Sequence, residues 1–148
     1  MTYPHPDVVS FIDERFVPVK LHIAEQADAI EPYAVPWTPG LLVLDAGGRQ
    51  HRRMIGYHLP EDLVAELALA WTVAAIEADD FAEAQARAKV AAERSKHDRE
   101  RAAEARYWET VVTYKLTGDG LIDGWRGLVA AFPGTTWARK VESIVKSA

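Results

Sequence analysis

The chain has 148 residues, of which 49% are hydrophobic and 26% charged, and this composition excludes a globally disordered chain. Its formal net charge is −5 at pH 7, which argues against a nucleic-acid partner, because a nucleic-acid-binding surface needs an excess of Lys and Arg. No apolar run approaches the ~20 residues that span a bilayer, so we expect no membrane partner and a cytoplasmic location. Cysteine is absent, which excludes disulfides, thiolate metal sites and thiol catalysis by this chain.

The first predicted elements are a short helix and a strand. Pro6 and Asp7 suit the first turn of a helix, and the apolar face that follows them predicts a helix ending near Arg15. Residues 16–23 then alternate between an apolar set and a set that includes a proline, a lysine and a histidine, and this period of two predicts a strand. Because Pro18 has no N–H to donate, we expect it at the strand start or on an unpaired side.

A second helix and a hairpin follow. Apolar residues at helical spacing predict a helix of two or three turns within residues 25–33. The run 41–44 is short and continuously apolar, which is typical of a strand buried on both faces. Glycines in residues 45–49 predict a turn, and residues 50–55 are the returning strand.

Beyond residue 60 the sequence predicts only helices. A proline and two acidic residues at 60–62 begin a helix of about 60–78, which belongs to both parts of the chain. The later helices are expected at 81–94, 102–116, 121–132 and from Thr136, the predicted N-cap, onward. The predicted fold class is therefore an α/β unit over residues 1–60 and an all-α unit over residues 61–148.

Several features of the first half follow one another in a telling order. They are Phe16-Val17-Pro18-Val19, the helix ending at Tyr33, Trp37-Thr38-Pro39, the run Leu41–Asp45, Gly48 and Arg53-x-x-Gly56-Tyr57. In this order they resemble the C-terminal half of a thioredoxin-like domain, although Gly40 replaces the more usual Thr or Ser. In that family the proline matching Pro39 is cis, and the preceding residue, here Thr38, offers its backbone to an extended peptide. The resemblance implies a peptide-binding edge at Thr38 and Pro39. Trp37 and Tyr57 are candidates for contacting the same peptide; the alternatives are that Trp37 packs the sheet edge and that Tyr57 is an ordinary core or surface residue.

The resemblance also implies a missing segment. The family fold begins with a central strand and a C-x-x-C motif, and residues 3–8 resemble the chain just after that motif. The middle strand between 17–23 and 41–45 is then absent, so either the natural start lies upstream or a native protein lacks the redox half. Both strands would have unpaired edges, which are costly, and direct pairing or insertion by a second copy would close the gap. We therefore expect a homodimer.

The helical half contains two sets of residues with similar spacing. The first is Trp71, Thr72, Ala75, Phe81, Ala84 and Ala88, and the second is Tyr114, Leu121, Trp125, Leu128 and Pro133. These sets resemble the packing positions of tetratricopeptide-type repeats. An amphipathic helical bundle is an equally good interpretation. The whole chain is similar to bacterial proteins in which such helices follow a thioredoxin-like domain.

No catalytic, metal or cofactor site is predicted. Asp45, His51 and His58 lack a recognised ligand spacing, and a structural zinc site normally needs four ligands. The basic cluster of Arg49, Arg52 and Arg53 could receive an acidic peptide or phosphate, but a solvated hairpin tip is the favoured interpretation.

Two functional hypotheses follow. The first is a non-catalytic thioredoxin-like module that binds a protein or peptide, with the helical unit available for partner or self-association. The alternative is a fragment of a thiol–disulfide oxidoreductase whose active-site cysteines lie upstream of the given start. We favour the first, with no enzymatic activity for the chain as given, because thiol chemistry requires a thiolate.

Overall fold

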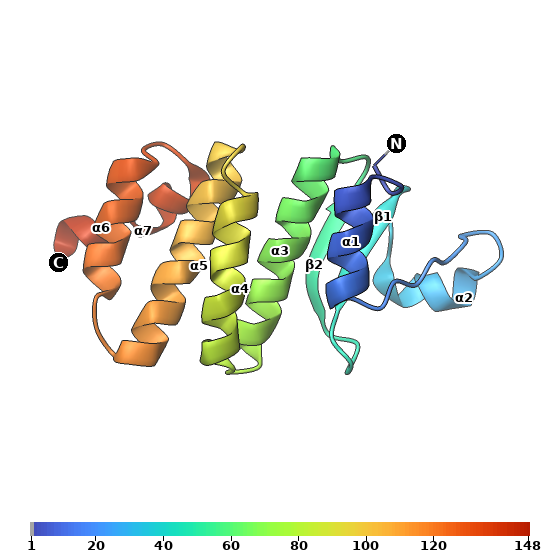
Figure 1. The fold of residues 1–148 in the computed structure, drawn as a ribbon, viewed down its shortest axis with the longest axis horizontal. Coiled ribbons are helices and arrows are strands. Elements are labelled where there is room, and N and C mark those ends of the chain that lie inside the picture. Colours follow the sequence, from blue (N-terminus) through green and yellow to red (C-terminus); the bar gives the residue numbers. More distant parts are fainter. Residues whose placement is uncertain (1) are drawn as a thin grey trace. The chain divides into compact units, whose positions relative to one another are not determined.

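The computed structural model describes residues 2–148 (Figure 1). The elements are α1 (Pro6–Arg15), α2 (Ala27–Ile30), the short 3-10 helix η1 (Glu31–Tyr33), β1 (Gly40–Leu44), β2 (Gln50–Ile55), α3 (Pro60–Glu77), α4 (Phe81–Arg94), α5 (Arg99–Thr117), α6 (Leu121–Ala131) and α7 (Thr136–Ser147). They form two compact units, Met1–Val64 and Ala65–Ala148, which we call the N-terminal and C-terminal units. The chain is thus a mixed α/β part followed by an all-α part, as predicted. No helix in residues 2–148 is long and apolar enough to cross a membrane.

Helix α1 begins and ends where the sequence predicts. The Nδ1 atom of His5 accepts a hydrogen bond from the N–H of Asp7 at 3.3 Å, which satisfies one of the free donors of the first turn. Val8 and Phe11, three residues apart on one face, are buried, and they are core residues of the N-terminal unit. The extended conformation of Phe16 ends the helix.

The predicted hairpin is confirmed. β1 and β2 pair antiparallel, with Leu41 opposite Met54 and Val43 opposite Arg52, and a bulge follows Val43. A turn with Gly48 at φ 83° connects the strands, a left-handed conformation that favours glycine. Val43 is the one buried residue of β1, so the prediction of a strand buried on both faces is wrong. Leu41, Leu42 and Leu44 stay partly exposed, because within residues 2–148 no second layer fully covers either face of the strand.

The predicted strand at 16–23 is absent. The residues after α1 run to α2 as a coil without regular structure, which Figure 1 shows in blue. The apolar set faces solvent, with Val17 90% and Val19 76% exposed. A strand requires a hydrogen-bonding neighbour, and the described sheet contains only β1 and β2. Within residues 2–148 this segment pairs with neither strand, although one edge of β1 is open, so the alternation predicted a strand that the single chain does not form.

Side-chain caps fix the helix boundaries of the C-terminal unit. Asp80 accepts from the N–H of Glu83 at 3.1 Å, and Asp98 accepts from the N–H of Arg101 at 2.8 Å. Because of the second cap, α5 begins before the predicted residue 102. Thr135 caps α7 through a 3.2 Å bond from the N–H of Ala138, so the prediction of Thr136 as the cap is wrong by one residue.

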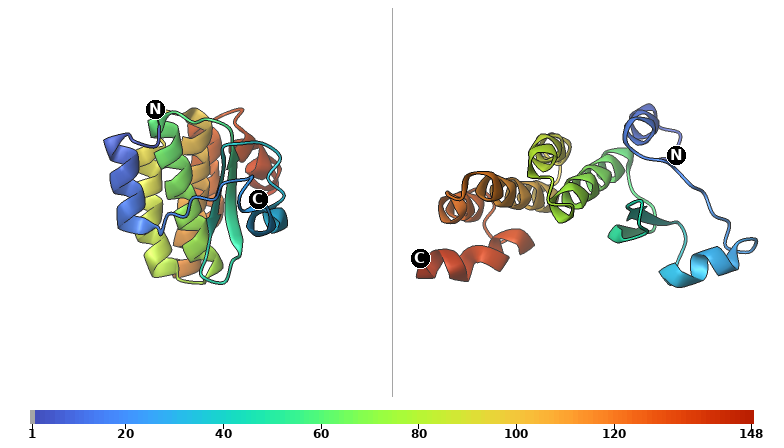
Figure 2. Two further views of the ribbon diagram at one scale, coloured as in Figure 1. Left: turned by 90° about the vertical axis from the view of Figure 1, so that its right-hand side faces the viewer. Right: turned by 90° about the horizontal axis from the view of Figure 1, so that it is seen from below.

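Helices α5, α6 and α7 share an aromatic core. α7 contacts both α5 and α6, on one side of that pair (Figure 2). Tyr107 stacks on Trp125 with ring centroids 5.9 Å apart, and Trp137 lies 5.0 Å from Tyr107. Leu128, which is fully buried, packs in the same cluster. Gly124 permits this packing, because a Cβ there would lie 2.4 Å from Cγ2 of Thr110 on α5.

Candidate functional site

The four predicted site residues lie at the open end of the hairpin, opposite the turn. The N–H of Gly56 donates to the carbonyl of Pro39 at 2.8 Å, so the segments before β1 and after β2 leave the sheet side by side. Trp37, Thr38 and Pro39 precede β1, and Tyr57 follows β2. The bond between Thr38 and Pro39 is cis, as the family resemblance implied.

This end of the hairpin exposes aromatic side chains. Trp37 is 71% exposed and Tyr57 is 85% exposed. The N-terminal segment joins them, because the hydroxyl of Thr2 donates to the carbonyl of His58. Burial first, and the nearby Tyr57 second, raise the pKa of the Tyr3 phenol above its usual value. Tyr3 thus adds a third, half-exposed aromatic ring to this end.

The backbone at Thr38 is also open. Within residues 2–148, neither its N–H nor its carbonyl bonds to another backbone group. Gly40 stands where the family usually has Thr or Ser, and the structure gives a local cause: a Cβ at this position would lie 2.6 Å from Cγ1 of Val35. The glycine therefore lets the segment before β1 pack closely against the first strand residue.

Arg53 fixes the segment that leads into the site. Its guanidinium donates to the carbonyl of Tyr33 and, at 3.4 Å, to the carbonyl of Ala34, where η1 ends. Sequence analysis assigned Arg53 to a solvated hairpin tip and missed this role. The contact joins residues about twenty positions apart, and no local pattern signals it.

The turn end of the hairpin holds a separate polar group. The Asp45 carboxylate accepts from the N–H groups of Gly47 and Arg49, both at 2.9 Å, and lies 3.1 Å from Nε2 of His51. The Arg49 N–H first, and His51 and Gly47 after it, hold the pKa of this carboxyl below its usual value. His58 follows β2 at the other end, so the hypothetical Asp45, His51 and His58 site does not form. In residues 2–148 no three metal-ligating side chains cluster.

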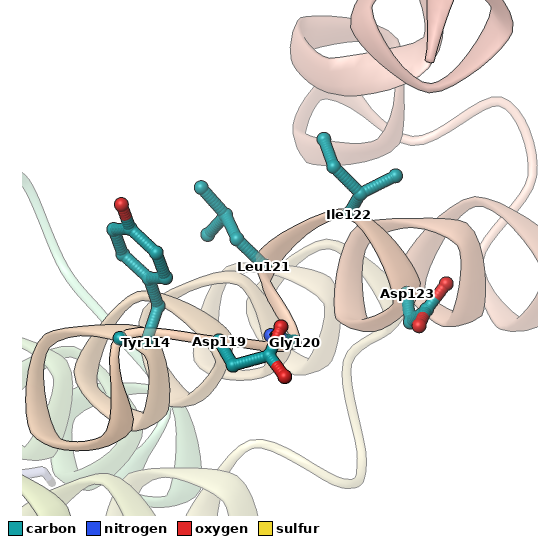
Figure 3. A pocket seen from close by; sticks show the side chains of 7 residues that line it. Tyr114, Asp119, Gly120, Leu121, Ile122 and Asp123 are labelled. Atoms are coloured by element: carbon teal, nitrogen blue, oxygen red, sulfur yellow. The ribbon is translucent and has the colours of Figure 1, made fainter.

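The C-terminal unit contains a shallow hollow of about 290 Å³ between the end of α5 and the start of α6 (Figure 3). Tyr114, Leu121 and Ile122 point to one side of it, and Asp119 to the other. The Asp119 carboxylate already has a hydrogen-bond partner in the loop, since its Oδ1 accepts from the N–H of Gly120 at 2.6 Å.

Comparison with known proteins gives no match among family models, curated proteins or solved structures. The exposed aromatic end of the hairpin remains the strongest candidate site.

Proposed function

We propose that this chain is a non-catalytic interaction module that holds an extended peptide of a partner protein at the open end of its hairpin. The observation that carries the proposal is the exposure of Trp37 and Tyr57 on the two segments that leave the sheet side by side. Exposed large aromatic rings are characteristic of protein-binding surfaces, because they bury much apolar area at a small cost in side-chain entropy.

The backbone of Thr38 supplies the complementary polar contact. Its N–H and carbonyl are free of backbone partners in the described residues and can pair with the main chain of an extended peptide. The rings of Trp37 and Tyr57 would then contact apolar side chains of the same peptide. Recognition would rest on the peptide's shape and apolar character rather than on charge.

The proposal includes a family assignment. The order of α1, the cis Thr38–Pro39 bond, β1, β2 and α3 supports a thioredoxin-like origin of the N-terminal unit, while the missing strand at 16–23 counts against a complete fold of that kind. Contacts between α4 and α5 and between α6 and α7 support an interpretation of the C-terminal unit as tetratricopeptide-like helix pairs. The oxidoreductase hypothesis has no thiol among the 148 residues to support it.

The test is selection of binders from a displayed library of random linear peptides, followed by calorimetry with one selected peptide. Trp37→Ala should weaken binding about thirtyfold, the loss expected for an aromatic hot spot. Tyr114→Ala is the matched control, because Tyr114 is a half-exposed aromatic residue of the other unit. Thr38→Ala should retain the affinity, since the backbone makes the contact. The proposal fails if no peptide is enriched, or if Trp37→Ala and Tyr114→Ala bind equally well.

A further inference from the structure

The N-terminal unit contains two features that complement each other and do not pair within the chain: the open edge of β1 and the extended segment 16–21. We propose that two copies of this chain exchange these features, so that segment 16–21 of each copy adds a strand to β1 of the other. This goes beyond the peptide site, which lies at a different place on the hairpin and does not depend on it.

The geometry of the hairpin shows which groups of β1 are available. Opposite residues in an antiparallel pair alternate between bonded and non-bonded positions. The N–H of Gly56 bonds to Pro39, and the N–H of Asp45 bonds to Arg49, so the odd-numbered residues of β1 face β2. Gly40, Leu42 and Leu44 therefore direct their N–H and carbonyl groups to the open edge. In residues 2–148 these N–H groups have no backbone partner there.

The two edges of the sheet differ in chemistry. β1 has the sequence GLLVL and carries no charge, whereas β2 has the sequence QHRRMI with two adjacent arginines. Charged side chains on an edge strand discourage pairing with another strand, and their absence permits it. An isolated two-stranded hairpin is marginal in water, so a third strand would stabilise this sheet. The edge of β1 is thus the side open to strand addition.

Segment 16–21 has the pattern of the strand that would fit. Val17, Val19 and Leu21 are exposed in the single chain, and their N–H groups have no backbone partner in the described residues. In a strand these three donors point to one edge, and Pro18 and Lys20 lie on the other. Proline and lysine are the residues that close an edge. The exchanged strand would therefore end the sheet, giving a closed dimer rather than a fibre.

A second copy is the occupant that both features favour. Within residues 2–148, neither residues 17–21 nor the open edge of β1 has a strand partner. The segment ends at a turn. There the N–H of Gln26 donates to the carbonyl of His22 at 2.9 Å, and the side-chain oxygen of Gln26 accepts from the N–H of His22 at 2.7 Å. A reciprocal exchange about a twofold axis satisfies the edge and the segment of each copy at once.

The first test is light scattering on the intact chain after size exclusion. The expected mass is twice the 16.5 kDa of one chain. Val19→Pro removes a donor from the pairing edge and should weaken the dimer about tenfold or more, because each of the two exchanged strands loses one bond. Lys20→Pro, a change on the outer edge of the same segment, is the matched control and should leave the dimer intact. Leu42→Pro should act like Val19→Pro, since this N–H does not face β2.

The second test uses the absence of cysteine in the chain. Leu42→Cys in one preparation is mixed with Val17→Cys, Val19→Cys or Leu21→Cys in another, and at least one mixture should form a disulfide-linked heterodimer on mild oxidation. A monomeric parent chain, equal dimers in Val19→Pro and Lys20→Pro, or cross-linking of Leu42→Cys with itself alone would each overturn the proposal. Trp37→Ala should leave the mass unchanged, which separates this inference from the peptide site.

Discussion

The two units treat their large apolar side chains differently. Of the thirteen that are exposed in residues 2–148, ten lie in the N-terminal unit, although it is the shorter of the two. The C-terminal unit stacks Tyr107, Trp125 and Trp137 inside a three-helix contact, whereas the N-terminal unit leaves Trp37 and Tyr57 in solvent. A helical unit can satisfy its backbone within each helix, but a two-stranded sheet cannot. The exposed apolar surface of the described residues is therefore concentrated in the N-terminal unit, where we propose that a partner binds.

The largest expected effect tests whether the C-terminal unit is the packed one. Leu128→Ala should lower the free energy of unfolding by about 2–5 kcal/mol, since Leu128 is fully buried and the change leaves a cavity. The matched change Leu59→Ala, at a residue 61% exposed in the N-terminal unit, should alter it by less than about 0.5 kcal/mol. Urea unfolding followed by circular dichroism measures both. Similar losses would remove the contrast between the units.

The next effect concerns the close contact of α5 and α6. Gly124→Ala should cost about 1–3 kcal/mol, because its Cβ would clash with Thr110. Gly127→Ala, in the same helix, meets its nearest atom at 3.9 Å and should instead gain about 0.5–1 kcal/mol from helix propensity. Adding Thr110→Ala to Gly124→Ala should restore part of the lost stability. Thermal unfolding of the parent chain and these three variants measures the changes, and a gain in Gly124→Ala would show that the helices separate easily.

The smallest effect is on the hairpin turn. The pKa of the Asp45 carboxyl is lower in the folded chain than in the unfolded chain. The ionised carboxylate therefore stabilises the fold fully at a pH above the unfolded-state pKa of about 3.9, and this stabilisation is lost as the pH falls through the folded-state pKa. Asp45→Asn should therefore reduce the difference between unfolding midpoints measured at about pH 6 and about pH 3. His51→Asn should reduce it in part, because His51 supplies one of the bonds. An unchanged difference in Asp45→Asn would contradict this account.

Local signals in the sequence predicted most elements. The prolines at the starts of α1 and α3 act within one turn of the residues that they affect. The caps at Asp80 and Asp98 are equally local but were not recognised, and α5 therefore begins before the predicted residue 102. The hairpin was predictable for the same reason, since its strands lie next to each other in the sequence. The cis bond before Pro39 followed from the family resemblance rather than from any local rule.

The larger errors concern contacts between distant residues, whereas those at the start of α5 and at the cap of α7 shift a helix boundary by three residues or fewer. The alternation at 16–23 indicates which side chains would share a face, but whether a strand forms depends on a neighbour that this pattern does not reveal. Arg53 likewise bonds to the end of η1, which lies far from it in the sequence. The four predicted site residues do lie at one end of the hairpin, yet the open Thr38 backbone and the part played by Tyr3 are visible only in the structure.

The attachment of Arg53 to the end of η1 has a consequence for the proposed peptide site. Arg53 fixes the carbonyls of Tyr33 and Ala34, and β1 begins at Gly40, so only residues 35–39 lie between two fixed points. So short a bridge has few alternative conformations, and the entropy lost on binding should be correspondingly small. The loop that carries Trp37 and Thr38 is thus pre-organised by a residue of the opposite strand, and a ligand would meet it in a conformation close to the bound one.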